Sequence, residues 1–426
     1  MALSATVSPA GASTSALPNL DSIIRGLLYL YVLSLPFKRL LFIERNGFII
    51  LIVLLVLWCA VNRRHFFLRT PIDLPLIAFV AWVAFTVPFA TFPAYSSKEF
   101  AKLLQQGLVF YGVVFFFREP IHRRRLVWLL IGALAVVGLY GIWQYLTDVK
   151  DHISYRSFDS LGELAVIESF LPGEVWLTTY LVMLIPFAFA VVLGADRGGG
   201  AIVAGAAAFA GVICQSLTFS RAGLVSLLGE AVAVVVLIRR RGVLLVAVGF
   251  IVVMALGAGL LLQARSMSEG PLGTIADRKF DAANLVARFN IWTYALEKIP
   301  ERPLTGFGFG KDNFYMVFGS ETERMHVPGR HEMPAGTHNL FLDLAVGVGP
   351  VGLALFLWLL GVIGSSAYKN YRHAVSPLQR AAGLGLLLSL VGVIIRNSLD
   401  YMMVGSLAVL FWVLAGLALS PEDSPN

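Results

Sequence analysis

The chain contains 426 residues, of which 58% are hydrophobic and 14% are charged, and it carries a formal net charge of +7 at pH 7. Its mean hydropathy is +0.77. This composition excludes an ordinary soluble domain and predicts an all-α membrane protein that crosses the bilayer many times. Basic loops beside anionic lipid make such a protein basic, so the net charge does not require a nucleic-acid partner.

Residues 1–20 are polar and lack the basic and apolar segments of a signal peptide, so we expect a disordered cytoplasmic tail there. Residues 21–263 are expected to hold spans one to nine, and residues 264–337 a large outer loop. Residues 338–420 are expected to hold spans ten to twelve, and residues 421–426 a second cytoplasmic tail.

Apolar windows of about 15 to 22 residues, the length that a helix needs to cross the hydrocarbon core, recur along nearly the whole chain. They predict about twelve transmembrane helices. The expected spans are residues 23–37, 48–61, 76–92, 103–117, 126–146, 176–193, 201–217, 222–238, 243–263, 340–363, 381–395 and 404–419.

The distribution of Lys and Arg predicts the orientation, because cytoplasmic loops retain positive charge. With the amino terminus inside, the basic runs at residues 63–64, 123–125 and 239–241 fall in cytoplasmic loops. Lys38 and Arg39 in the first outer hairpin are exceptions. Both termini are therefore expected in the cytoplasm, with residues 148–173 and 264–337 as the large outer loops.

The sequence lacks the common motifs for metals and cofactors. Cys59 and Cys214 both fall inside expected spans, where we interpret them as core residues rather than a disulfide or a metal site. The sequence shows no zinc spacing, no P-loop and no dinucleotide fingerprint. We therefore expect no cofactor, no metal and no nucleotide hydrolysis.

The first polar constellation is Ser220-Arg221, which separates two apolar helices. Ser220 is expected to cap the following helix through its hydroxyl. Arg221 then lies at the positive end of the helix dipole, a conflict that a bound anion between the guanidinium and the backbone N–H groups would resolve. The alternative is an arginine that reaches lipid headgroups.

The second constellation lies within the outer loop. Arg288 is expected on a short helix that Pro300 and Pro303 end, either as an anion ligand or as a surface charge. Gly306 and Gly308 belong to a glycine repeat that lets the backbone approach a ligand closely, or that forms only a turn. The helix is expected to pack on the membrane domain through the apolar residues Ile291, Trp292, Ala295, Leu296 and Ile299.

The third constellation is Thr337-His338-Asn339, where the outer loop re-enters the membrane. We interpret Thr337 as the helix N-cap, which leaves His338 in the first turn. There the helix dipole favours a neutral imidazole, which suits a general base facing water. The alternative is a structural histidine.

Ionisable residues inside expected spans are functional candidates by default. Lys102 is placed where it extends the anion site, and Glu230 is expected to bond another helix. Arg396 and Asp400 are expected to form a local i,i+4 pair. Asp343 lies five residues beyond His338, where helix rotation is unfavourable for direct contact.

These motifs together resemble the bacterial O-antigen ligase/polymerase superfamily. The resemblance rests on Ser-Arg-x-Gly at residue 220, on Arg-x-x-x-Trp at residue 288 ahead of Pro and Gly-x-Gly, and on His-Asn-x-x-Leu at residue 338. It implies a GT-C-like inner-membrane glycosyltransferase whose outer loop and active site face the periplasm. Within the superfamily the chain looks most like the O-antigen ligase.

The resemblance also implies roles and partners. Arg221 and Arg288 match arginines expected to bind the donor diphosphate, and His338 matches the expected general base; Lys102, Gly306, Gly308 and Asn339 are further candidates for substrate binding. The reaction would be a metal-independent, inverting transfer of O-antigen from undecaprenyl diphosphate to a lipid A–core hydroxyl in lipopolysaccharide biosynthesis. An O-antigen polymerase shares this topology. A flippase or other transporter is the alternative of a different class, for which internal repeats and broken helices are typical signs.

Overall fold

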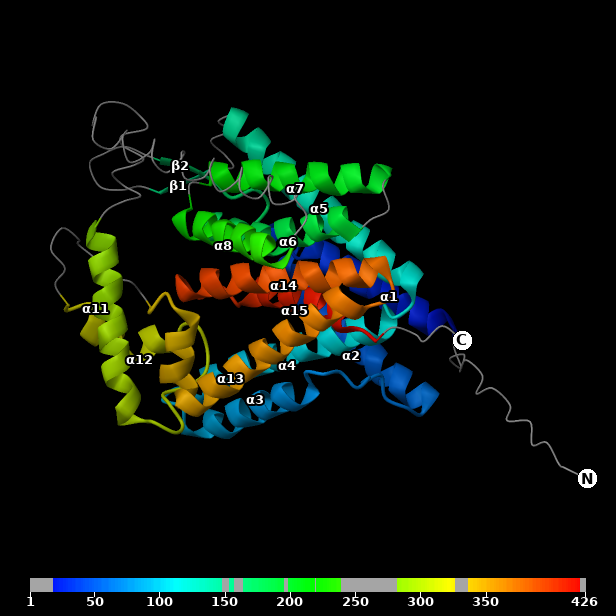
Figure 1. The fold of residues 1–426 in the computed structure, drawn as a ribbon. Helices are drawn as coiled ribbons and strands as arrows, with labels where there is room; N and C mark the ends of the chain where they lie inside the picture. The colour runs from blue at the N-terminus through cyan, green and yellow to red at the C-terminus, as the bar shows by residue number, and fades with distance from the viewer. Residues whose placement is uncertain are drawn as a thin grey trace, which may run out of the picture.

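The computed structural model describes residues 18–147, 153–156, 164–194, 198–218, 220–238, 282–325 and 336–421. Helices make up nearly all of these residues (Figure 1). The longer helices are α1 (Pro18–Ser34), α2 (Leu41–Asn62), α3 (Asp73–Thr86), α4 (Pro93–Phe116), α5 (Pro120–Thr147), α6 (Glu174–Gly194), α7 (Gly199–Leu217), α8 (Arg221–Leu237), α11 (Ala282–Lys298), α12 (Asn313–Thr322), α13 (Leu340–His373), α14 (Pro377–Ser398) and α15 (Gly405–Leu419).

The helices agree closely with the hydropathy of the sequence. Eleven of the twelve expected spans coincide with a helix, and residues 243–263 lie outside the described residues. Within the described part, α5, α6, α7, α13 and α14 are long and apolar enough to cross a membrane, and residues 46–62, 73–89 and 405–419 form shorter apolar helices. The fold class of a helical membrane protein is confirmed, whereas the count of twelve spans stays a prediction.

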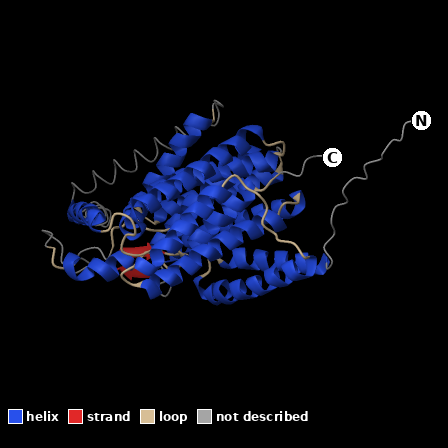
Figure 2. Cartoon of the chain, turned by 90° about the horizontal axis from the view of Figure 1, so that it is seen from below, coloured by secondary structure: helices blue, strands red, loops and turns tan. Residues whose placement is uncertain are grey.

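Figure 2 shows the helices packed side by side, with the short strands toward one end. Of the described helices, α6, α14 and α15 are the most buried. These helices are apolar on all sides, as expected for helices surrounded by others. Helix α14 packs against α6, α8, α13 and α15. Helix α7 instead keeps Ile202 and Phe209 exposed, as expected of a helix that faces lipid.

The two ends of the bundle differ. At one end lie α11, α12 and a short hairpin of β1 (Ile153–Arg156) and β2 (Leu164–Ile167), paired antiparallel with Ile153 opposite Ile167 (Figure 1). This hairpin corrects the expectation of a purely helical chain. At the other end Arg123 bonds Gln379 at 2.6 Å and the carbonyl of Pro421 at 3.3 Å, which joins the starts of α5 and α14 to the end of α15.

Helix α11 packs as the apolar stripe predicts, with one correction. Ile291 and Ala295 are fully buried, but Leu296 is 55% exposed and points away from the membrane domain. Helix α11 ends at Lys298 and a 3-10 turn of Ile299–Glu301 follows, in agreement with the stop predicted at Pro300.

The glycine repeat contacts the backbone of α13. Phe307 N donates to the carbonyl of Val346 at 3.0 Å, and Gly308 N donates to the carbonyl of Gly347 at 2.8 Å. A Cβ on Gly306 would lie 2.3 Å from the Gly347 oxygen. Helix α13 is kinked here, with non-helical backbone at Val348 and Gly349, so its carbonyls are available to the loop.

This close approach predicts a large effect of one methyl group. In Gly347→Ala the new Cβ would lie 2.6 Å from the Gly308 oxygen, so we expect a loss of about 1–3 kcal/mol of stability, as for other overpacked positions. Thermal unfolding in detergent measures it. Gly361→Ala, in the same helix with open space around the new atom, is the matched control and should not lower the melting temperature; equal melting temperatures for both variants would contradict the packing described here.

Candidate active site

A cavity of about 470 Å³ lies at the end of the bundle that carries α11 and α12. Its walls come from the start of α6, the start of α12, the start of α13 and the segment between α14 and α15. The polar side chains that line it are Glu174, Lys311, Asp312, His338, Asp343 and Asp400. Its size suits a small-molecule ligand, since such sites measure roughly 300–1,000 Å³.

His338 lies just before α13 rather than inside its first turn. Asn339 is the N-cap, because its side-chain oxygen accepts from the backbone N–H groups of Phe341 at 3.0 Å and Leu342 at 3.2 Å. The expectation that Thr337 caps this helix is therefore wrong. His338 adopts a left-handed conformation with φ of 51°, and the helix-dipole argument for its neutral form no longer applies.

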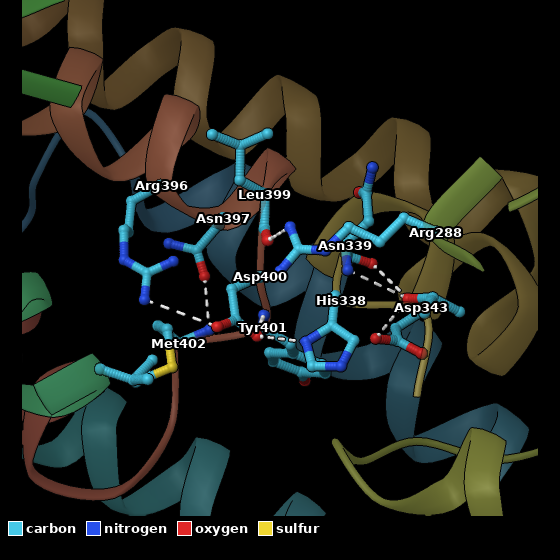
Figure 3. Close-up of polar contacts among 12 residues, drawn as sticks. Arg288, His338, Asn339, Asp343, Arg396, Asn397, Leu399, Asp400, Tyr401 and Met402 are labelled. Carbon is cyan, nitrogen blue, oxygen red and sulfur yellow. Dashed lines mark hydrogen bonds and ion pairs between the residues drawn. The ribbon is translucent and has the colours of Figure 1, made fainter. Parts of the chain in front are cut away.

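A chain of polar contacts orients the imidazole instead (Figure 3). His338 Nδ1 lies 3.0 Å from Asp400 Oδ1, and Arg396 Nη2 lies 3.5 Å from Asp400 Oδ2. Because a carboxylate only accepts hydrogen bonds, Nδ1 carries the proton in this contact and Nε2 of the neutral ring is an acceptor. The side chain of His338 is 36% exposed, so this second nitrogen is accessible from the cavity.

Asp400 stays ionised in this environment. Burial alone raises the pKa of its carboxyl, but the hydrogen bond with His338 and the charge of Arg396 outweigh burial and hold that pKa well below its ordinary value. The expected i,i+4 pair of Arg396 and Asp400 is confirmed. Arg396 itself is 2% exposed, so a carboxylate beside it balances a buried charge.

The contact predicts how an isosteric change at Asp400 acts. Asp400→Asn should slow turnover by about tenfold or more, because the ring loses its fixed orientation. Steady-state kinetics measures the rate. An unchanged rate would contradict the orienting role.

The same substitution has a stability signature. A carboxyl with a depressed folded pKa contributes stability above its unfolded pKa of about 4 and loses it as the pH falls through the folded value. The melting temperature of the unmodified chain should therefore exceed that of Asp400→Asn near neutral pH, and the difference should shrink in acid. A difference that does not depend on pH would contradict this assignment.

Helix α11 brings Arg288 to the same place. Arg288 Nη1 donates to the carbonyl of Leu399 at 2.6 Å, next to Asp400 (Figure 3). One turn along the helix, Trp292 Nε1 donates to the carbonyl of Thr337 at 2.7 Å, next to His338. Arg288 and Trp292 lie on one face of α11, as their spacing allows. Their contacts connect α11 to the segment that carries Asp400 and to the segment that carries His338.

Arg221 begins α8 and is half-buried. Ser220 occupies the N-cap position, but its side chain makes no capping hydrogen bond, which corrects the expected role of its hydroxyl. The first turn of α8 packs close to α6, since a Cβ on Gly223 would lie 2.4 Å from the methyl group of Thr178. Thr178 lies one turn after Glu174, a residue of the cavity wall.

Among the candidate residues, His338 lines the cavity, whereas Arg221, Arg288 and the remaining candidates are not part of its wall. Lys102 pairs with Glu99 at 2.5 Å and lines a small neighbouring crevice of about 60 Å³ between α4, α13 and α15. Gly306 and Gly308 pack on α13, and the side-chain oxygen of Asn339 caps that helix. The contacts of Gly306, Gly308 and Asn339 explain why these residues occupy their positions even without a ligand. The roles of all four residues in substrate binding stay predictions.

Two further sequence expectations concern buried groups. Glu230 packs against Gly392 of α14 and is 4% exposed, but its Oε1 has no hydrogen-bond partner among the described residues. Cys214 is buried and Cys59 is partly exposed. Within the described part of the chain, no three His, Cys, Asp or Glu side chains converge as metal ligands would.

Comparison with known proteins finds a family that matches part of the chain. Residues 206–357 match the O-antigen ligase family. The resemblance predicted from the motifs is thereby confirmed, and the matched stretch includes Arg221, Arg288 and His338.

Curated relatives match a shorter part of the chain. A "Putative polysaccharide ligase" of Rickettsia felis is 29% identical over 117 residues, which cover 26% of this chain and 27% of that protein. A protein of the same name from Rickettsia bellii is 35% identical over 89 residues, or 20% of this chain and 22% of its own length. The chain thus matches about a quarter of the length of these relatives.

The sequence did not reveal that residues beyond the matched stretch 206–357 contact His338. Asp400 and Arg396 lie beyond residue 357, and Asp400 is separated from His338 by 62 positions. The only signal was that both are ionisable residues at the end of an apolar span. Helix rotation predicted no direct contact between Asp343 and His338. Both side chains line the same cavity, because His338 lies outside the helix.

Proposed function

We propose that this chain is an inner-membrane O-antigen ligase, which transfers O-antigen from undecaprenyl diphosphate to a hydroxyl of lipid A–core on the periplasmic side. The single observation that carries the proposal is the His338–Asp400 contact at 3.0 Å on the wall of the cavity. Arg288 bonds the carbonyl of Leu399, the residue before Asp400. The ligase-family match and the names of the relatives support it.

In this proposal His338 is the general base. Nε2 removes the proton of the acceptor hydroxyl while the hydroxyl oxygen forms a bond to the anomeric carbon of the donor. The bond from that carbon to the diphosphate oxygen breaks on the opposite face, and the electron pair leaves with undecaprenyl diphosphate. The configuration at the anomeric carbon is therefore inverted. The Asp400 carboxylate stabilises the imidazolium that forms, as the aspartate does in a Ser-His-Asp triad.

Arg288 and Arg221 are assigned to the diphosphate. A departing diphosphate gains negative charge in the transition state, and fixed guanidinium groups in a partly dehydrated cleft stabilise that charge without a metal. Arg288 donates to the carbonyl of Leu399, next to Asp400 of the cavity wall, while Arg221 starts α8 beside the first turns of α6. The lipid tail of the donor would lie against apolar helices, so the cleft should open sideways to the bilayer.

The orientation is part of the proposal. Arg123, which belongs to one of the basic loops expected in the cytoplasm, lies at the end of the bundle opposite the cavity. If that end faces the cytoplasm, both termini are cytoplasmic and the cavity faces the periplasm.

Reconstitution tests the function directly. The purified chain in liposomes would receive a polyprenyl-diphosphate glycan and lipid A–core. Transfer of the glycan to lipid A–core is the expected result. Growth of the lipid-linked glycan would show an O-antigen polymerase, and relocation of the donor without a new bond would show a flippase; either result would overturn the ligase proposal.

A further inference from the structure

The cavity beside His338 contains a buried carboxyl group that the transfer reaction does not yet use. Asp343 is 9% exposed and lines the cavity together with His338 (Figure 3). Its Oδ2 accepts from the hydroxyl of Thr337 at 2.8 Å. Its Oδ1 is buried and has no hydrogen-bond partner among the described residues.

An unpartnered carboxyl oxygen at such a position requires an explanation. Leaving a buried acceptor unsatisfied costs about 1–3 kcal/mol, and more when the group is charged. Apolar residues would fill the start of α13 without this cost. The helix cap does not need Asp343 either, because Asn339 supplies it.

The surroundings of Asp343 indicate what would bind there. Lys311, Asp312 and Asp400 are the charged groups that act on its carboxyl. All three line the cavity, and so does Trp176. Side chains that accept and donate hydrogen bonds beside an aromatic ring fit a polyhydroxylated ring with an apolar face, which is the chemistry of a sugar. They do not fit a second phosphate, because four of the five Asp, Glu and Lys side chains that line the cavity are acidic.

We propose that Asp343 binds the acceptor sugar: its carboxyl group forms a hydrogen bond with a hydroxyl adjacent to the one that His338 deprotonates. The inference rests on the proposed transfer to a lipid-linked sugar. The acceptor is favoured over the donor because Asp343 shares the cavity with the base, whereas Arg288, assigned to the donor, lies on the side of Leu399.

A substitution that keeps the size but removes both oxygens tests the proposal. In Asp343→Leu, the KM for lipid A–core should rise by about tenfold to a hundredfold, the loss expected when the sugar hydroxyl is left buried without its partner. The KM for the polyprenyl-diphosphate donor should stay within about twofold. Asp343→Asn, which keeps hydrogen-bonding atoms, should recover much of the acceptor affinity.

A second variant separates substrate binding from the support of Thr337. Thr337→Val removes the hydroxyl that donates to Oδ2 but leaves Oδ1 in place. It should lower kcat or the melting temperature without raising the KM for lipid A–core. If Thr337→Val raises that KM as much as Asp343→Leu does, or if Asp343→Leu changes only the donor KM or neither KM, the proposal is overturned.

The same assay distinguishes this proposal from the proposed function. Absence of any transfer by the unmodified chain would contradict the ligase function itself. Transfer by the unmodified chain with an unchanged acceptor KM in Asp343→Leu would contradict only the role of Asp343.

Discussion

Replacing His338 by Ala should lower the rate of glycan transfer by at least about 10²–10⁴, the range that a positioned general base contributes. The ring makes its described contact with Asp400 and not with the groups assigned to the diphosphate, so donor binding should remain largely intact. Single-turnover transfer and equilibrium binding of the lipid-linked donor measure the two effects separately.

His373→Ala is the matched control for this substitution. His373 is exposed and lies at the opposite end of α13, far along the same helix. The control should transfer glycan at the unmodified rate. Full turnover in His338→Ala would show that the base is another group.

Replacing Arg288 by Ala should both slow transfer and weaken donor binding. Removal of one donor to a developing oxyanion costs about 10²–10³ in rate, and the guanidinium also binds the ground-state diphosphate in our proposal. Arg288→Lys should recover little, because an ammonium cannot donate in the same paired geometry. Donor titration of both variants in proteoliposomes is the measurement.

Arg324→Ala removes an equal charge from an exposed position after α12 and controls for long-range electrostatics. It should leave donor affinity unchanged. If Arg288→Ala bound the donor as tightly as Arg324→Ala, the diphosphate would have to lie elsewhere, and the assignment of Arg221 would fail with it.

Most of the helical fold was predictable because burial in lipid and burial in protein demand the same apolar windows. Expected spans such as residues 340–363 and 381–395 therefore coincide with α13 and α14. The hairpin of β1 and β2 was not predicted, since its strands are only four residues long and lie in a polar loop. The apolar stripe on α11 predicted that Leu296 is buried, but this residue is exposed. It lies at the edge of the stripe, where no partner covers it.

The sequence pointed to candidate residues of the site but not to how they connect. Its motifs single out Arg221, Arg288 and His338, whereas the contact between His338 and Asp400 depends on how α13 and the end of α14 pack. The cap was ambiguous for a similar reason: Thr337 and Asn339 are both good capping residues. Only the backbone geometry places the helix start after His338.

A structure of the chain with an unreactive polyprenyl-diphosphate glycan in lipid nanodiscs would test the central claim most directly. We expect the diphosphate to contact Arg288 and Arg221, with the anomeric carbon facing His338 Nε2 across the cavity. A diphosphate bound at the opposite end of the bundle, near Arg123 and Gln379, would contradict the account.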